Sequence, residues 1–195
     1  MTTKDLASRL QPWLARWSID DPQGVQAWLD RMAVRSFAAD EHLVRAGDVD
    51  DTLFLLDSGL VRLYYATPDG KERNKAFFTA EQVTGPVSAA ITGSPAPFSI
   101  QALEPTEALA FHYRDLIEAA ERNPQLARLL LQLLGSAFIR NEQREAMLLT
   151  LNAQARYAWL LAHEPHLIDR VPQFHIASYL GVDAVSLSRL KKKFK

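Results

Sequence analysis

The C-terminal segment, residues 171–195, constrains the fold of this chain more than any other stretch, and it reads VPQFHIASYLGVDAVSLSRLKKKFK. Its pattern predicts two short helices joined by a tight turn. Pro172 suits the first helical position, where an N–H would have no helical partner, and Gly181 permits a turn that a side chain would obstruct. Asp183 is a candidate N-cap for the second helix. The segment therefore predicts a helix-turn-helix, with an amphipathic helical hairpin and a solvated lysine tail as the plainer alternative.

Apolar residues in this segment recur at the spacing that two packed helices require. The predicted buried faces consist of Ile176, Ala177 and Leu180 in the first helix and Leu187 and Leu190 in the second. On the second helix this leaves Ser186, Ser188 and Arg189 facing outward. We therefore expect that helix to present a polar and basic face.

Charge is distributed unevenly along the chain. The formal net charge is −1, yet residues 170–195 hold six Lys or Arg residues and a single acidic residue, Asp183. The preceding residues are therefore acidic in sum. A basic end on an acidic body attracts phosphate at one pole and repels it elsewhere, which favours an interaction with nucleic acid at the C-terminal end.

The same segment resembles a known family. IASYLG followed by LSRLKKK is similar to the DNA-binding end of bacterial regulators in the Crp/Fnr superfamily, and most similar to the compact branch that reads IASYLG…SLSR near the C-terminus. The resemblance implies a transcriptional regulator whose partners are double-stranded DNA, a second copy of the chain and RNA polymerase. The DNA-binding residues expected on this basis are Arg189, Ser188, Ser186, Val185, Gln173, Lys191, Lys192 and Lys195.

Arg189 is the residue expected to read sequence, as a bidentate donor to O6 and N7 of a guanine. In the Fnr-type motif a glutamate stands three residues before a Ser-Arg pair; here Ser188 and Arg189 match, but Val185 replaces the glutamate. That replacement removes an acceptor for cytosine and favours contact with a thymine methyl, so we expect a different operator sequence. Gln173 and some of the lysines should meet phosphates. Because few residues follow the motif, the wing of longer relatives is expected to be reduced or absent.

Upstream, residues 36–112 have the texture of short strands separated by turns. Pro68-Asp69-Gly70 is a hairpin signal between two β-rich runs, and glycines at hairpin spacing predict a small barrel or jelly roll. The order AGD…LFLL…SGLVRLYY…PDGKE resembles the cyclic-nucleotide-binding-type β-roll of Crp/Fnr regulators. Helices are predicted on its N-terminal side at residues 6–17 and 22–35, the second capped by Asp20 or Asp21. The expected fold class is α+β.

The longest helical pattern, residues 124–149, reads PQLARLLLQLLGSAFIRNEQREAMLL and is apolar nearly all round in its first half. Such a helix must be buried on more than one side. In the family the matching helix packs on the β-roll and pairs with its twin, and reading a palindrome also requires two copies. A homodimer is therefore favoured over a simple core helix. The predicted domains are 1–122 (sensor), 123–149 (dimerisation helix) and 150–195 (DNA binding), with Asn152 capping a helix over 153–164.

The resemblance also locates an effector site. The family's nucleotide cassette begins at a glycine, here Gly85, followed by a ribose-binding glutamate and later a phosphate-binding arginine. Pro86 stands at the glutamate position and Ala96 near the arginine position, and no Lys or Arg occurs between Lys75 and Arg114. Because a buried phosphate without a cation is costly, cyclic AMP is not expected.

A pocket for another, unidentified small molecule is predicted instead. Its expected lining consists of Val87, Ala89, Ile91, Phe98, Ile100, Asn141 and Glu142. For Asn141 and Glu142 an equally acceptable interpretation is that they are ordinary polar residues of a long helix, with no role in binding.

Other kinds of site are not expected. The absence of cysteine excludes disulfides, thiolate zinc sites and Cys-ligated iron–sulfur clusters. The five histidines form no convincing metal set, and no nucleophile-elbow, phosphate-loop or paired-carboxylate pattern indicates catalysis. No apolar run reaches the length of a membrane span, and the charged N-terminus lacks a signal-peptide core, so a cytoplasmic location is expected. The sequence thus predicts a homodimeric Crp/Fnr-type regulator; the alternative is a ligand-binding or protein-interaction module whose helix-turn-helix no longer reads DNA.

Overall fold

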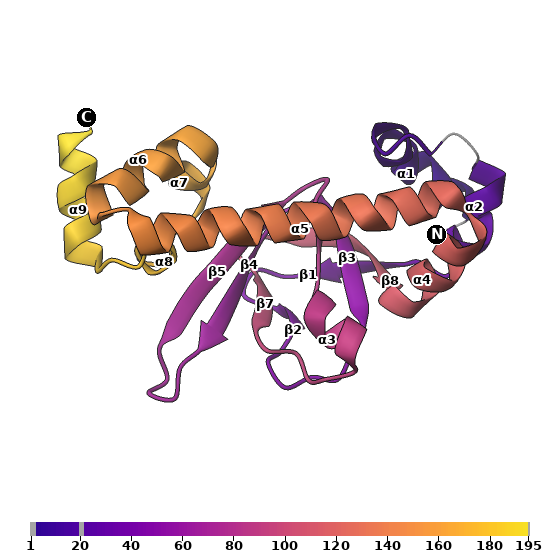
Figure 1. The fold of residues 1–195 in the computed structure, drawn as a ribbon, viewed down its shortest axis with the longest axis horizontal. Coiled ribbons are helices and arrows are strands. Elements are labelled where there is room, and N and C mark those ends of the chain that lie inside the picture. The colour runs from indigo at the N-terminus through magenta and orange to yellow at the C-terminus, as the bar shows by residue number, and fades with distance from the viewer. Residues whose placement is uncertain (1–2, 20–21, 195) are drawn as a thin grey trace.

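Two antiparallel sheets lie under one long helix, with a helical unit at each end of the molecule (Figure 1). The computed structural model describes residues 3–19 and 22–194. The first sheet has the order β1-β8-β3-β6, with β1 at Ala33–Phe37, β8 at Thr106–His112, β3 at Thr52–Ser58 and β6 at Val83–Thr84. The second has the order β2-β7-β4-β5, with β2 at His42–Val44, β7 at Ser99–Ala102, β4 at Leu60–Ala66 and β5 at Glu72–Thr79. This arrangement confirms the predicted α+β class and β-roll.

Strand β3 is buried on both faces, which explains its uninterrupted apolar run. Phe54 and Leu56 point between the two sheets, where they pack with Phe78 and Ile100. The alternate residues Leu53 and Leu55 face the other way, into a second core that the helices cover. The β-roll therefore has an inner core between its sheets and an outer core beneath the helices.

The helices that build the outer core come from the chain segments before and after the β-roll. They are α1 at Thr3–Arg16, α2 at Pro22–Leu29, α4 at Tyr113–Arg122 and α5 at Pro124–Thr150, while the short α3 at Val87–Thr92 lies in the loop after β6. Trp28 links these layers, because its ring lies 6.4 Å from that of Trp13 in α1 and 5.4 Å from that of Phe111 in β8. Among the described residues, no helix is long and apolar enough to cross a membrane.

The sequence prediction of a helix over residues 22–35 is wrong in its second half. Helix α2 ends at Leu29, and Ala33–Phe37 forms β1, paired in register with Ala110 through Thr106 of β8. The local pattern was compatible with a helix, but pairing with a distant strand decides the conformation. The predicted caps Asp20 and Asp21 lie outside the described residues.

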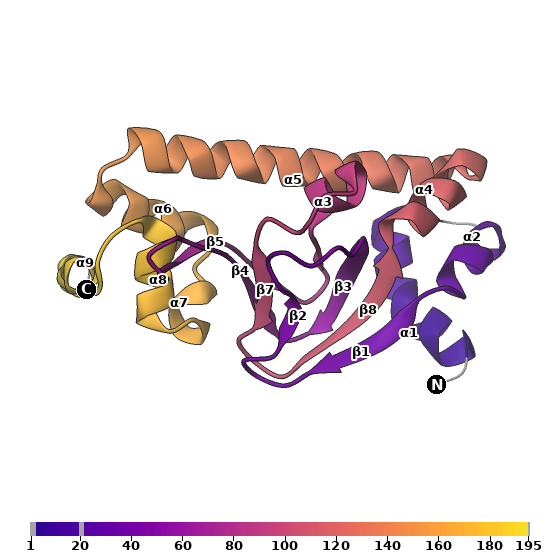
Figure 2. The same cartoon turned by 90° about the horizontal axis from the view of Figure 1, so that it is seen from below.

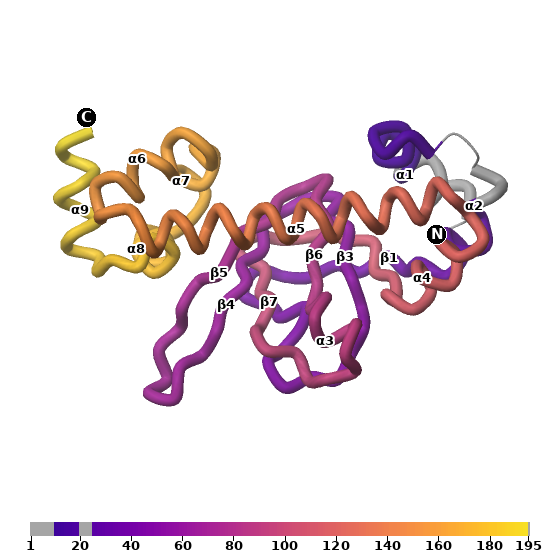
Figure 3. The backbone as a smooth tube through the Cα atoms, viewed as in Figure 1, coloured from indigo at the N-terminus to yellow at the C-terminus, as the bar shows by residue number. Residues whose placement is uncertain are grey.

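The hairpin prediction at Pro68-Asp69-Gly70 is confirmed. Strands β4 and β5 flank this turn and pair antiparallel, and the hairpin projects away from the rest of the roll (Figure 3). Its ladder contains one irregularity: Leu63 is opposite Ala76, and the next residue, Tyr64, is opposite Asn74. Lys75 is therefore an extra residue, a β-bulge, in β5.

Helix α5 runs along the molecule to the C-terminal unit, which consists of α6 at Ala153–His163, α7 at Leu167–Arg170, α8 at Gln173–Leu180 and α9 at Ala184–Lys193. Asn152 caps α6 as predicted, because its side chain accepts a hydrogen bond of 3.0 Å from the backbone N–H of Ala155. Helix α7 was not predicted. In the described part of the chain, no strand follows β8.

Candidate DNA-binding helix and ligand pocket

The turn between α8 and α9 is built as its glycine and aspartate predict. Gly181 ends α8 with φ +65°, a left-handed conformation that glycine adopts without strain. Asp183 then caps α9 by accepting hydrogen bonds from the backbone N–H of Ser186 at 2.7 Å and from the hydroxyl of Ser186 at 2.8 Å. The pKa of the Asp183 carboxyl is lowered by these hydrogen bonds.

Helix α9 has one buried and one exposed face. Leu187 and Leu190 are buried, and with the apolar side of α8 they form a core that also includes Tyr157 and Leu160 of α6. The exposed face carries Val185, Ser188, Arg189, Lys192 and Lys193. An uncovered helix face with free basic side chains is what entry into a DNA groove requires.

The remaining residues predicted for DNA binding are placed less simply. Gln173 is exposed at the start of α8, and Lys191 is half-buried. Ser186 is also half-buried, and its hydroxyl donates to the capping carboxylate of Asp183, so in this structure it is not a free donor. Lys195 lies outside the described residues.

Helix α8 lies beside the β5 side of the β-roll (Figure 2). Buried polar contacts that the sequence did not reveal hold it there. Asn74 of β5 donates from its backbone N–H to the hydroxyl of Ser178 at 3.0 Å and from its side chain to the backbone carbonyl of His175 at 3.0 Å. The guanidinium of Arg62, which is 4% exposed, lies 3.2 Å from Nδ1 of His175 and 2.6 Å from the carboxylate of Glu72. We call Arg62, Asn74, His175 and Ser178 the docking cluster.

Long helix α5 joins the same interface. Arg144 donates from Nη2 to the backbone carbonyls of Asn74 and Tyr179, at 2.8 Å in each case. Its guanidinium also lies 4.0 Å from the centre of the Tyr179 ring. One arginine therefore connects α5, β5 and α8.

Burial in the docking cluster, together with the charge of Arg62, lowers the pKa of His175 to about 4. Glu72 and Asp40 oppose this shift by favouring the charged imidazole. At neutral pH the ring is uncharged, and Nδ1 is an acceptor that faces the donors of Arg62 and Asn74.

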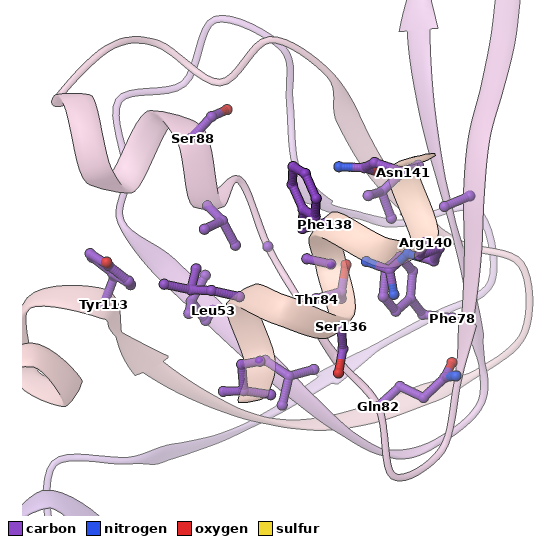
Figure 4. A pocket seen from close by; sticks show the side chains of 18 of the residues that line it. Leu53, Phe78, Gln82, Thr84, Ser88, Tyr113, Ser136, Phe138, Arg140 and Asn141 are labelled. Atoms are coloured by element: carbon purple, nitrogen blue, oxygen red, sulfur yellow. The ribbon is translucent and has the colours of Figure 1, made fainter. Parts of the chain in front are cut away.

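A pocket of about 470 Å³ lies between the β-roll and the middle of α5. Figure 4 shows Phe138, Arg140 and Asn141 on α5, with Arg140 beside the ring of Phe78. The wall opposite α5 comes from β5, β6 and α3, and it is largely apolar. An apolar concavity with a few polar groups is the usual form of a small-molecule site.

Four of the seven residues that the sequence predicts for this pocket line it, namely Val87, Ile91, Phe98 and Asn141. The other three do not. Ala89 faces a separate hollow beside His112, and Ile100 has no exposed surface because it packs between the sheets. Glu142 is exposed and absent from the lining, one residue further around α5 than Asn141.

The pocket lining also includes basic residues from outside the Gly85 cassette: Arg16, which is paired with Glu81, and the two cations Lys75 and Arg140. Lys75 reaches it from β5 and Arg140 from α5, outside the stretch between Lys75 and Arg114 that holds no basic residue. The matching positions of the cassette remain without charge: Pro86 is buried, and Ala96 is 3% exposed within the inner core. Periodicity along one segment cannot show which distant side chains share a cavity.

Asp50, Asp51 and His112 form a second polar group, with one ligand-type atom of each within 4.8 Å of the others. The sequence did not predict this grouping. Nδ1 of His112 lies 2.6 Å from Asp51, and the guanidinium of Arg114 lies 3.8 Å from the same carboxylate. The Asp51 carboxylate is therefore already engaged by His112 and lies beside the charge of Arg114.

One comparison with known proteins matches the β-roll, and others cover most of the chain. Residues 34–123 match a family model described as a cyclic nucleotide-binding domain. The chain is 26% identical over 166 residues to the fumarate and nitrate reduction regulatory protein of Vibrio cholerae, covering 80% of this chain and 66% of that relative. It is 28% identical over 169 residues to the transcriptional activator protein Anr of Pseudomonas aeruginosa, covering 80% and 67%.

Among solved structures, FixK2 from Bradyrhizobium japonicum is similar with a TM-score of 0.74 and 20% identity, covering 84% of each chain. This similarity supports the fold. The aligned part of the chain spans about two thirds of the length of the two sequence relatives.

Proposed function

We propose that this chain, which belongs to the Crp/Fnr superfamily of bacterial transcriptional regulators, binds palindromic DNA as a homodimer through the exposed face of α9. The observation that carries the proposal is the separation of faces on α9, with Leu187 and Leu190 buried and Arg189 exposed beside Ser188. Arg189 would donate to a guanine in the major groove, and Lys192 and Lys193 would meet phosphates. RNA polymerase is a further expected partner.

The proposed dimer uses the uncovered apolar side of α5. Leu126 and Leu129 have no exposed surface, whereas Leu131, Phe138 and Ile139 are 70%, 63% and 54% exposed. Side chains of this size facing water are unfavourable, and an exposed apolar stripe on a helix is typical of an interface. Two copies joined along α5 would each present an α9 to the DNA.

The proposed effector is a small molecule other than cyclic AMP. Pro86 and Ala96 support this, because neither can make the ribose and phosphate contacts of the family's nucleotide cassette. The effector would act by binding more tightly to one of two arrangements of the DNA-binding unit.

In vitro selection from random duplex DNA with the purified protein tests this proposal. We expect enrichment of a two-fold palindrome with half-sites about one helical turn apart. Arg189→Ala should abolish the sequence preference while leaving salt-dependent, non-specific binding. Lys192→Ala is the matched control: it should weaken binding to all sequences alike and reduce the salt dependence. Enrichment that Arg189→Ala leaves unchanged would exclude the reading role of Arg189, and no enrichment would favour a module that does not read DNA.

A further inference from the structure

Two basic side chains in the α5 pocket lack an acidic partner among the described residues. Lys75 and Arg140 both line the pocket, and neither forms an ion pair with any residue that the structure describes. Their observed neighbours are aromatic rings instead. Nζ of Lys75 lies 4.5 Å from the centre of the Phe98 ring, and the guanidinium carbon of Arg140 lies 4.3 Å from the centre of the Phe78 ring.

The position of these charges is unfavourable without an anionic partner. Both side chains are half-buried, and burial lowers the pKa of each below the value of an exposed side chain. The charge of Arg140 lowers the pKa of Lys75 further, because the two cations repel each other. Cations brought together away from water are stabilised when an anion lies between them.

Thr84 of β6 is an independent indication of a polar ligand. Its side chain is 3% exposed and lines the pocket, and its hydroxyl has no hydrogen-bond partner among the described residues. A buried hydroxyl is normally satisfied. The acidic residue of the lining, Glu81, does not complete the site, because its carboxylate lies 2.6 Å from the guanidinium of Arg16.

The fold itself directs Lys75 into the pocket. Lys75 is the extra residue of the β5 bulge, and Ala76 and Phe78 beyond it line the pocket, whereas Asn74 and Phe77 contact the C-terminal unit. In a regular strand Asn74, Ala76 and Phe78 would share one face. Bulges of this kind commonly re-aim a side chain at a functional site.

We propose that the α5 pocket binds a small organic anion with an apolar body, with its charged group between Lys75 and Arg140 and hydrogen-bonded to Thr84. The body would lie against Phe78, Phe98 and the leucines of α5. This inference rests on the proposed function, since it gives the chemical class of the proposed effector. It departs from the family's cassette, because both cations come from outside that segment.

Binding of 1-anilinonaphthalene-8-sulfonate to the full chain without DNA provides the first measurement. We expect the probe to be displaced by 2-naphthoate but not by the neutral 2-naphthamide, which has the same shape. Comparison with 2-naphthyl phosphate then separates carboxylate from phosphate preference. Lys75→Met and Arg140→Met should each weaken naphthoate binding about ten-fold or more, the loss expected for one charge-assisted contact, and Lys75→Arg should retain it.

Matched controls are available on the same two elements. Arg73 of β5 and Arg128 of α5 are exposed and lie outside the lining, so Arg73→Gln and Arg128→Gln should leave naphthoate binding unchanged. Equal displacement by naphthamide, or binding unchanged in both Met variants, would overturn the proposal. The proposal would also be overturned if Lys75→Met and Arg140→Met weakened the dimer but left probe binding unchanged. That result would mean that a second copy of the chain supplies the anion for these two cations. Since no DNA is present, failure here is distinct from failure of the DNA-selection experiment.

Discussion

Gly181 and Gly93 end their helices in nearly the same backbone conformation, with φ +65° and +68°, but in different surroundings. A Cβ atom at Gly93 would meet nothing within 4 Å. A Cβ atom at Gly181 would lie 3.1 Å from Nη1 of Arg156. The same nitrogen donates to the carbonyl of Leu180, and other nitrogens of Arg156 donate to Leu148 and Leu151.

Gly93→Ala should therefore reduce the free energy of unfolding by about 1 kcal/mol, the cost of a left-handed alanine. Gly181→Ala should reduce it by about 2 kcal/mol, because it also disturbs a hydrogen bond of Arg156 at the junction of α5, α6 and α8. Denaturant unfolding of both variants measures the difference. Equal losses would show that Arg156 yields to the added methyl group without cost.

At this scale the sequence predicts what a residue does for its own neighbours. The roles of Gly181 and Asp183 follow from a helix end and a helix start, which are local events. The role of Lys75 does not, because it depends on the register between β4 and β5. A one-residue shift in that register changes which face a side chain points to, and the local pattern does not encode it.

Among the elements, α5 offers the sharpest test of assembly. Leu131 is 70% exposed and lies outside the pocket lining, so a change there tests the proposed interface without altering the pocket. Leu131→Glu should place a charge in the apolar stripe and raise the dimer dissociation constant by about ten-fold or more. Sedimentation velocity over a range of protein concentrations measures this constant.

Gln154→Glu is the control for that change. Gln154 is exposed on α6 and also lies outside the lining, so the variant adds the same charge away from the apolar stripe of α5. It should sediment as the unaltered protein does. If both variants dissociate equally, net charge and not the apolar stripe governs association.

Elements whose pattern is strong over many residues were predictable. The apolar sequence of α5 and the hairpin at Pro68-Asp69-Gly70 are in this class, and the structure confirms both. The end of α2 was not, because residues 33–37 find their partners in β8, far along the chain. The short helices α3 and α7 were also not predicted, since four to six residues carry too little periodicity to be distinguished from a loop.

At the scale of the whole molecule, the docking cluster joins the C-terminal unit to the β-roll and makes this junction sensitive to pH. The pKa of His175 is about 4 in the folded chain, whereas an exposed histidine titrates near 6.5. Between these values the unfolded chain binds a proton that the folded chain does not. The contribution of His175 to stability is therefore fully present above pH 6.5 and is lost as the pH falls towards 4.

His175→Gln removes this titration. We expect the free energy of unfolding of the unaltered protein to fall, relative to this variant, by roughly 1 to 3 kcal/mol between pH 6.5 and pH 4. Chemical denaturation at a series of pH values gives the difference curve, in which the titrations of other residues cancel. His163→Gln is a suitable control, because His163 is exposed on α6 and should leave the curve unchanged. A flat difference curve would show that His175 does not resist protonation.

The pocket and the docking cluster share two elements. Lys75 and Asn74 are successive residues of β5, and Arg140 and Arg144 are one turn apart on α5; the first of each pair faces the pocket and the second holds α8. In a regulator built this way, a pocket ligand that changes the affinity of the protein for DNA by some factor has its own affinity changed by DNA by the same factor. Copies on an operator and copies free in solution would then respond at different effector concentrations. The effector concentration at which the protein responds would therefore depend on how many operator sites the genome contains.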